Sequence, residues 1–281
     1  MTFVPSAIAV KDAVARALRE DLGDAGDITT AACIPADAES KVVIAARAPG
    51  VIVGIDLARE AFAQIDARVR CGVGKEDGAK VAKGDVVLHI EGPSRGILTA
   101  ERVALNFLCQ LSGVATATAA LVDAVKGTGV QIACTRKTTP GLRAFEKHAV
   151  LCGGGRNHRF GLYDAILIKD NHIAAAGGIA KALKEAQASA GHLVKIEIEV
   201  DSLAGLEEAL AAGAEAVLLD NFAIADLKKA VMLTKGRAVL EASGNVSPGT
   251  VRAIAETGVD LISSGWITHS APALDLGLDF R

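Results

Sequence analysis

The sequence predicts an α/β protein in which a strand-rich module precedes a parallel sheet. Six apolar, strand-like segments after residue 130 alternate with alanine-rich helical segments, and their starts lie about 22 to 34 residues apart, as in βα units. The strands are expected in QIACT, AILIK, VKIEIEV, AVLLDN, AVLEAS and LISSG, with helices over residues 178–190, 203–212, 223–233 and 247–257. Six strands are too few for a regular eight-stranded barrel, so the residues alone leave open whether this sheet closes.

The N-terminal elements begin with an expected amphipathic helix over residues 6–22. Ser6 is a suitable N-cap, apolar residues follow at helical spacing, and Gly23 comes directly after the segment. Residues 40–92 contain the runs KVVIAARA, VIVGI and DVVLHIEG, which are rich in valine and isoleucine and separated by turn residues. This composition and the turn residues between the runs predict a strand-rich module.

A long helix is expected over residues 99–126, and its segment 103–122 carries no charged residue. Twenty uncharged residues are enough to cross a membrane. Polar residues recur along the segment, however, and polar groups without partners are poor neighbours for lipid. We therefore expect a helix buried in the core or against a second subunit, and no membrane span.

The composition restricts the class of protein. The chain has 281 residues, of which 51% are hydrophobic, enough to build a sizeable core. Its five cysteines are widely spaced and form no CxxC pair, so neither a disulfide framework nor a zinc site is favoured and a reducing cytoplasm is expected. A formal net charge of -3 gives no support for nucleic-acid binding.

The segment from residue 135 to 172, TRKTTPGLRAFEKHAVLCGGGRNHRFGLYDAILIKDNH, concentrates positive charge. Arg136 and Lys137 follow one apolar run and Lys169 ends the next, so these cations lie at the ends of consecutive buried strands. Such ends meet at one edge of a parallel sheet. The pattern predicts a site for an anion.

One part of this segment has a simpler interpretation. Arg143, Glu146 and Lys147 have the spacing of neighbours on one helix face, where charges of both signs usually face solvent.

The run VKIEIEVD makes the clearest local argument. Lys195, Glu197 and Glu199 alternate with apolar residues and share one face of a strand. A barrel strand covered outside by helices turns its other face inward, so three charges would be enclosed and would need partners. A solvated edge strand is the alternative.

The same alternation places further polar residues on inward faces near the C-terminal strand ends. Lys169 shares a face with Leu167, Asp220 with Leu218, and Ser243 with Glu241. Ligands of parallel α/β folds bind at this end.

Cations from the early strands and carboxylates from the middle ones suit an anionic substrate together with a divalent metal. Magnesium usually takes one or two protein carboxylates and completes its shell with water and phosphate. Glu199 and Asp220 could provide these carboxylates.

Two loops could hold phosphate. The loops Ser243–Gly244–Asn245 and Ser264–Gly265–Trp266 follow two strands, where barrel enzymes hold phosphate. Each loop could equally be an ordinary tight turn.

The remaining motifs are weaker. The glycine triplet at residues 153–155 lacks dinucleotide-binding spacing, and we interpret it as a turn that lets His158 and Arg159 approach a ligand. His172 could be ligand-binding or structural. No histidine spacing suggests zinc, and no serine lies in a nucleophile elbow. These residue types favour a reaction driven by binding and charge stabilisation over covalent acyl transfer.

Several motifs in this order resemble the quinolinate phosphoribosyltransferases, the carboxylating nicotinate-nucleotide pyrophosphorylases. They are GDIT, ERVALNFLCQLSG, TRKTTPGLR, EKHAV, GGGRNHRFGL, LIKDNHI, EIEVD, LLDN, LEASGN and THSAPALDL, and they cover most of the chain. The resemblance implies an N-terminal α+β open-faced sandwich domain, residues 1–112, followed by an incomplete six- or seven-stranded α/β barrel, residues 113–269. The C-terminal tail, residues 270–281, is expected to pack back on the sandwich.

The resemblance also implies an activity and a site. Quinolinate and 5-phosphoribosyl-1-pyrophosphate would give nicotinate mononucleotide, pyrophosphate and carbon dioxide in NAD biosynthesis, with Mg²⁺ as cofactor. The implied catalytic residues are Lys137, Lys169, Glu199 and Asp220, the last two holding the metal directly or through water. Substrate would also contact Arg102, Thr135, Arg136, His158, Arg159, Ser243, Gly244, Asn245, Ser264, Gly265 and Trp266. The family further implies a homodimer in which Arg102 reaches the active site of the neighbouring subunit.

One residue departs from the family pattern, because Trp266 stands where the family generally has a smaller or flexible side chain. This puts the shape of the loop in doubt rather than the activity. Two alternatives stay open. One is a molybdenum-transport-associated relative that shares TRKT and KDNH, although the full set of basic residues, including Arg159, favours the transferase. The other is a non-catalytic barrel that binds a dicarboxylate.

Overall fold

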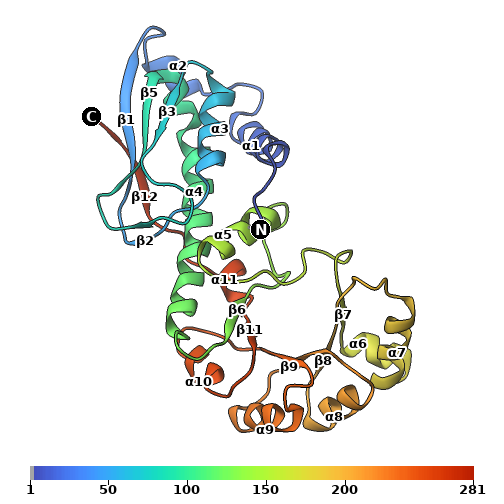
Figure 1. The fold of residues 1–281 in the computed structure, drawn as a ribbon. Coiled ribbons are helices and arrows are strands. Elements are labelled where there is room, and N and C mark those ends of the chain that lie inside the picture. Colours follow the sequence, from blue (N-terminus) through green and yellow to red (C-terminus); the bar gives the residue numbers. More distant parts are fainter. Residues whose placement is uncertain (1–2) are drawn as a thin grey trace. The chain divides into compact units, whose positions relative to one another are not determined.

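The computed structural model describes residues 3–281, which form two compact units (Figure 1). The first unit contains the chain up to residue 119 together with residues 139–154 and 270–281, and the second contains residues 120–138 and 155–269. The units therefore do not follow a single cut in the sequence, and the long helix α4 passes from the first into the second.

The first unit is built on a four-stranded antiparallel sheet. Its strands run in the order β12-β1-β5-β3, and a separate pair joins β2 to β4. The strands are β1 Glu39–Ala46, β2 Gly50–Val51, β3 Arg70–Val73, β4 Lys80–Val81, β5 Val86–Pro93 and β12 Leu276–Phe280. The helices are α1 Ala7–Leu22, α2 Ile28–Cys33, α3 Ile55–Ile65, α4 Ser94–Ala124 and α5 Arg143–Cys152. Because β12 pairs with β1, the C-terminal tail is part of this sheet.

The helix α1 begins as the sequence predicts. The Ser6 hydroxyl accepts a hydrogen bond from the amide of Ala9 at 3.2 Å, and Gly23 ends the helix. The helix α3 was not expected, because the valine- and isoleucine-rich run before it was interpreted as a strand. It starts after Gly54, whose φ of 109° makes a sharp turn, and it buries one apolar face.

The helix α4 is a core helix. It is long and apolar enough to cross a membrane, but 61% of its most apolar window is buried inside the protein. Its polar side chains have partners there: Ser112 is fully buried and bonds the backbone of Val53, while Thr116 accepts from the amide of Val51 and donates to Ser112. The expectation of a buried helix is thus met, with its polar groups satisfied by a strand and loop of the same unit.

The helix α5 is buried rather than solvated. Glu146 and Lys147 are fully buried, so the interpretation of this stretch as a solvated charged face was wrong. On the same helix His148 hydrogen-bonds through both ring nitrogens, Nε2 to Asp77 Oδ2 and Nδ1 to the carbonyl of Phe3, each at 3.0 Å. Both nitrogens face acceptors, and the Asp77 bond raises the pKa of His148 to about 10.

The second unit contains a six-stranded parallel sheet in the order β6-β11-β10-β9-β8-β7. Its strands are β6 Gln131–Ala133, β7 Ile166–Ile168, β8 Ile196–Val200, β9 Ala216–Asp220, β10 Val239–Ser243 and β11 Leu261–Ser263. The helices are α6 Asp170–Ala176, α7 Ile179–Ser189, α8 Leu203–Ala211, α9 Ile224–Thr234, α10 Val251–Ala255 and α11 Trp266–His269. All six predicted strands are present.

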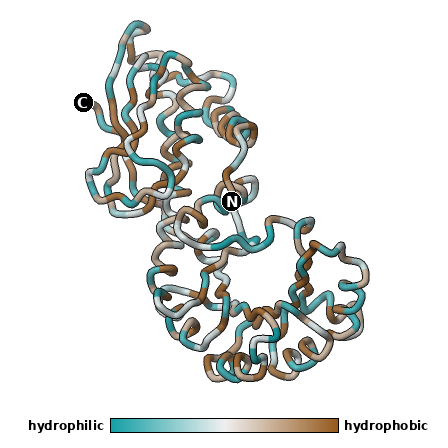
Figure 2. Tube along the Cα trace, viewed as in Figure 1, coloured by the Kyte–Doolittle hydropathy of each residue, from teal (hydrophilic) through white to brown (hydrophobic). Residues whose placement is uncertain are grey.

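The sheet curves with its helices outside. In Figure 1 the helices α7 to α10 lie around the outer face, and in Figure 2 brown, hydrophobic stretches follow the strands while the helices alternate in colour. Among the described strands β6 and β7 are the two ends of the order, so the barrel is incomplete. The predicted fold class, a sandwich domain followed by an incomplete six- or seven-stranded barrel, is confirmed, and the parallel sheet has six strands.

Candidate active site

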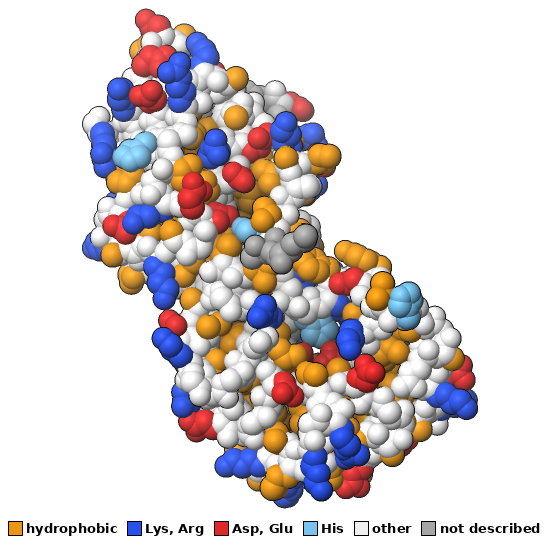
Figure 3. Space-filling model, in the orientation of Figure 1, with side chains coloured by type: hydrophobic (Ala, Val, Ile, Leu, Met, Phe, Trp, Pro, Cys, Tyr) orange, Lys and Arg blue, Asp and Glu red, His pale blue; other side chains and the backbone are white. Residues whose placement is uncertain are grey.

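A cavity of about 570 Å³ opens at the C-terminal ends of the parallel strands. In the second unit Figure 3 shows a hollow surrounded by basic, acidic and histidine side chains. The lining residues are Thr135, Arg136, Lys137, His158, Arg159, Leu167, Lys169, Glu199, Leu218, Asp220, Asn221, Glu241, Ser243, Gly244, Asn245 and Ser263. The structure thus brings together eleven of the fifteen residues expected to contact substrate.

The alternation of the strands explains which side chains reach the cavity. The pairs on β7, β9 and β10 that were expected to share an inward face all line it, namely Leu167 with Lys169, Leu218 with Asp220, and Glu241 with Ser243.

The alternation failed at one position. Lys195 was expected to be enclosed, yet its side chain is 81% exposed and lies 3.3 Å from Glu215. The strand β8 begins only at Ile196, so the first inward-facing residue of the strand is Glu197, and Lys195 lies before the strand at the end opposite the cavity.

The loop after β6 supplies cations. Thr135 Oγ1 accepts from the amide of Lys137 at 3.0 Å, which bends the chain so that Arg136 and Lys137 both line the cavity. Arg159 lines it from another loop, with one guanidinium nitrogen bonded to the Ala165 carbonyl at 3.1 Å. Burial, and after it the Arg136 charge, lowers the pKa of Arg159. Its buried Nε has no hydrogen-bond partner among the described residues, so this cationic wall suits an anion.

Lys169 stands at the rim opposite a carboxylate. Its Nζ lies 2.6 Å from Glu199 Oε2, and its side chain is 46% exposed against 15% for Glu199. Lys169 is also the N-cap of α6, and its amide donates to His172 Nδ1 at 2.9 Å. His172 therefore orients the backbone of Lys169 in this structure.

Asp220 belongs to a rigid platform made by two strand ends. Asn221 adopts a left-handed φ of 55°, donates from its side chain to Asp220 Oδ2 at 2.9 Å, and donates from its amide to the Ser243 carbonyl. Asn245, with a φ of 51°, donates to Asn221 Oδ1 at 3.3 Å. Gly244, directly before Asn245, has a φ of 98°. Strained backbone of this kind concentrates at functional sites.

The second expected phosphate loop lies at the edge of the cavity. Ser263 lines the cavity, whereas Ser264 is buried with its amide bonded to Ala133, and Trp266 starts α11. Gly265 packs closely on a cavity cation, because a Cβ there would lie 2.9 Å from Lys137 Cδ. These three residues adjoin the lining without belonging to it.

Arg102 lies on α4 in the first unit. Its side chain is exposed, and it does not belong to the residues that line the cavity of the second unit.

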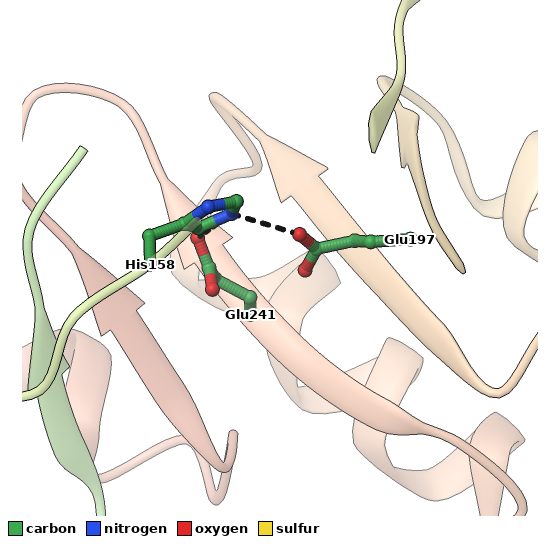
Figure 4. Close-up of side chains that lie close together, drawn as sticks. All are labelled: His158, Glu197 and Glu241. Atoms are coloured by element: carbon green, nitrogen blue, oxygen red, sulfur yellow. Dashed lines mark hydrogen bonds and ion pairs between the residues drawn. The ribbon is translucent and has the colours of Figure 1, made fainter. Parts of the chain in front are cut away.

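The floor of the cavity contains a cluster that the sequence did not reveal. His158, Glu197 and Glu241 place three possible ligand atoms within 4.8 Å of one another (Figure 4). His158 Nε2 is 2.9 Å from Glu197 Oε2 and 3.9 Å from Glu241 Oε1, while Nδ1 accepts from the Arg159 amide at 2.7 Å. Burial, followed by the charge of Glu197, raises the pKa of Glu241 to about 7.

Sequence reasoning therefore missed Glu197 with Glu241 as partners of His158, and it missed Asn221 and Ser263. A signal existed for Asn221, because asparagine after a strand end commonly adopts a left-handed turn. No local pattern could reveal that a loop histidine contacts two carboxylates on non-adjacent strands.

Matches to known protein families cover almost the whole chain. Residues 27–112 match the N-terminal domain of quinolinate phosphoribosyl transferase, and residues 114–279 match its C-terminal domain. The chain belongs to the quinolinate phosphoribosyltransferase family. The boundary between the two matches lies within α4.

Individual relatives agree with this membership. The chain is 47% identical over 278 residues to the nicotinate-nucleotide pyrophosphorylase (carboxylating) of Mycobacterium leprae, covering 96% of this chain and 97% of that protein. It is 42% identical to a quinolinate phosphoribosyltransferase (decarboxylating) of Nicotiana tabacum, covering 96% and 81% of the two chains. The solved nicotinate-nucleotide pyrophosphorylase of Francisella tularensis superposes with a TM-score of 0.95 at 40% identity, over 100% of this chain and 99% of that one.

Proposed function

We propose that this chain transfers the phosphoribosyl group of 5-phosphoribosyl-1-pyrophosphate to quinolinate, with decarboxylation. The observation that carries the proposal is the cavity itself. It presents Arg136, Lys137, Arg159 and Lys169 beside Glu199 and Asp220, in a chain of this family. The alternatives, a molybdenum-transport-associated relative or a non-catalytic barrel, are not favoured by relatives that are named as carboxylating pyrophosphorylases or decarboxylating transferases.

The cations suit the two carboxylates of quinolinate. Each carboxylate can take charge-assisted hydrogen bonds from fixed guanidinium or ammonium groups, which hold the ring in one orientation. The ring nitrogen then attacks C1 of the ribose, the bond from C1 to pyrophosphate breaks, and the nitrogen becomes cationic.

Decarboxylation follows from that charge. When the ring carboxylate next to the nitrogen leaves as carbon dioxide, its bonding electrons remain on the ring carbon, stabilised by the cationic nitrogen. A proton then completes that carbon and gives nicotinate mononucleotide. The residues contribute by orientation and by electrostatic stabilisation of the developing charges.

We further propose that Mg²⁺ acts with Glu199 and Asp220. The donor set fits a hard cation, since two carboxylates on adjacent strands line the cavity. Each is engaged through one oxygen, Glu199 with Lys169 and Asp220 with Asn221. When bound with pyrophosphate, the ion would offset negative charge on the leaving group. Loss of turnover on chelation, with recovery on addition of Mg²⁺, is the expected result.

The decisive experiment for the activity uses purified protein with both substrates and Mg²⁺. Quinolinate labelled in the carboxylate next to nitrogen should release labelled carbon dioxide in a one-to-one ratio with nicotinate mononucleotide. Binding of quinolinate without release of carbon dioxide or pyrophosphate would instead support a non-catalytic barrel.

We propose a homodimer in which Arg102 serves the site of the partner subunit. The proposal is supported by an exposed arginine on α4, in a unit different from the one that holds the cavity.

We also propose a cytoplasmic location. The five described cysteines are all free, which supports placing the protein in a reducing cytoplasm.

Mixed dimers test the shared site. Arg102→Ala and Lys169→Ala homodimers should both be nearly inactive, whereas a mixed dimer would have one site lacking both residues and one intact site. Random pairing of equal amounts makes half the dimers mixed, so activity should return to about a quarter of wild type. If mixed dimers form and remain as inactive as their parents, Arg102 serves its own subunit.

A further inference from the structure

The carboxyl group of Glu241 is buried without being neutralised by a cation. Its side chain on β10 is 3% exposed, and Oε1 has no hydrogen-bond partner among the described residues. Figure 4 shows this carboxyl directed toward His158 and beside the carboxyl of Glu197. Burial of an unpaired carboxylate is costly, so the group must gain either a cation or a proton.

His158 forms its hydrogen bond with Glu197 and not with Glu241. Its Nδ1 accepts a hydrogen bond from the Arg159 amide at 2.7 Å, so Nδ1 carries no proton. Its Nε2 therefore carries the ring's single proton and donates it to Glu197 Oε2 at 2.9 Å. In this arrangement the hydrogen bond of His158 goes to Glu197, while Glu241 Oε1 lies 3.9 Å from Nε2, beyond hydrogen-bonding distance.

The same hydrogen bond argues against a metal ion in the cluster. A neutral histidine that binds a metal through Nε2 carries its proton on Nδ1 and donates it to an acceptor. Here Nδ1 faces the N–H of Arg159, which is a donor. A proton on Glu241 is the remaining way to relieve the repulsion between the two carboxylates.

The hydrogen-bonding and charged groups around Glu241 come from several neighbouring elements. The strand β11 contributes the Ser263 hydroxyl, which hydrogen-bonds the carboxyl group. The strand β8 contributes Glu197, and the cavity lining adds Glu199 from β8 and Asp220 from β9. The cavity above contains the cations Arg136, Lys137, Arg159 and Lys169. In the empty cavity these cations therefore favour the ionised form of Glu241. A bound dianion neutralises the cations and removes that effect.

We propose that Glu241 takes up a proton when the cavity binds its dicarboxylate, so that quinolinate binding is linked to protonation of this floor residue. The inference rests on the proposed function and adds a specificity-determining group to it. The proton comes from hydronium or a buffer acid, whose bond to that proton breaks as the O–H bond on the Glu241 carboxyl forms. Ionised Glu241 would repel the dianion, and protonated Glu241 admits it.

The pKa of Glu241 makes the linkage measurable. Burial and the charge of Glu197 raise it from 4.5 to about 7, so the empty protein is partly ionised at neutral pH. A dianion in the cavity raises the pKa further. Quinolinate should therefore bind more weakly as the pH rises above 7, because the proton that accompanies binding becomes scarce.

Calorimetric titration of the full-length protein with quinolinate tests this linkage. At pH 7, in buffers that differ in ionisation enthalpy, the wild-type protein should take up about half a proton per site, because a group near its pKa is about half ionised. Glu241→Gln should remove this uptake, since glutamine cannot ionise. Glu146→Gln is the matched control: Glu146 is also buried with a raised pKa but lies in the first unit, so its replacement should leave the uptake unchanged.

The wild-type protein supplies a second measurement that does not depend on the folding of a variant. Its dissociation constant for quinolinate should rise by up to about tenfold per pH unit above 7. A pH-independent constant, or proton uptake that persists in Glu241→Gln, would overturn the inference and leave the proposed transferase intact. Absence of both quinolinate binding and turnover would overturn the proposed function itself.

Discussion

The platform that joins Asp220 to the loop after β10 predicts a selective effect of adding one methyl group. A Cβ at Gly244 would lie 2.6 Å from Asn221 Cγ, and the residue has a φ of 98°. Gly244→Ala should therefore lower the free energy of unfolding by roughly 1–3 kcal/mol through backbone strain. It should also displace Asn221, whose side chain and amide hold Asp220 and Ser243.

The size of the expected loss of activity follows from the displacement of Asn221. Misplacing a positioning group by about 1 Å costs on the order of a hundredfold in rate, so kcat/KM for the sugar pyrophosphate should fall to that extent. The matched control is Gly236→Ala, because Gly236 also has a positive φ, 71°, but no atom lies within 4 Å of a Cβ there. It should lose about 1 kcal/mol of stability and keep its activity.

Steady-state kinetics at saturating quinolinate, together with urea unfolding of both variants, separates the two effects. Similar kcat/KM values for Gly244→Ala and Gly236→Ala would refute the reasoning. The Asn221 platform would then be a feature of the fold without influence on the site.

Three further predictions concern the cavity and the first unit. Lys137→Ala and Lys169→Ala should each weaken quinolinate binding about ten- to hundredfold by loss of a charge-assisted contact, and should fold normally because both lysines are exposed; unchanged affinity in calorimetry would contradict the site. Nicotinate, which lacks one carboxylate, should not replace quinolinate because cavity cations would lose their partner, and comparable turnover would exclude this assignment. For His148 the folded pKa of about 10 lies above the unfolded value near 6.5, so its stabilisation is full below pH 6.5 and lost as pH rises to 10. The urea midpoint of wild type relative to His148→Gln should fall over that interval, and a constant difference would show that His148 is not charged.

Strand alternation was the most informative signal in the sequence. A strand in a helix-covered sheet has only two faces, so the position of one inward residue determines the others two residues away. This placed Lys169, Asp220 and Ser243 at the cavity. The same rule failed at Lys195 because alternation does not reveal where a strand begins.

Helical spacing was less informative, because it identifies neighbours on a face without indicating what covers that face. Glu146 and Lys147, three and four residues after Arg143, have the spacing of neighbours on a solvated face and are nevertheless fully buried. The helix α3 was missed for a different reason. Its buried residues Ile55, Ala58 and Phe62 recur at helical spacing, but the valine- and isoleucine-rich run before it dominated the interpretation.

Long-range partners were beyond sequence reasoning. The bond from His158 to Glu197 joins positions 39 residues apart. It depends on the register of β8 and on the course of the loop before β7, and neither is recorded in any local pattern. The left-handed conformation of Asn221 was locally plausible, but its link to Asp220 and Ser243 requires two strands to end side by side.

Sheet register explains how two glutamates in one cavity come to have different environments. Leu218 on β9 aligns with Glu199 on β8 and with Glu241 on β10, and all three line the cavity. An apolar side chain therefore stands between the two carboxyl groups. On one side Glu199 is paired with Lys169 at 2.6 Å; on the other, burial and the charge of Glu197 raise the pKa of the Glu241 carboxyl. The strand order thus separates a carboxylate paired with a lysine at the rim from a buried carboxyl of raised pKa at the floor, and two chemically identical side chains acquire different roles from their environments.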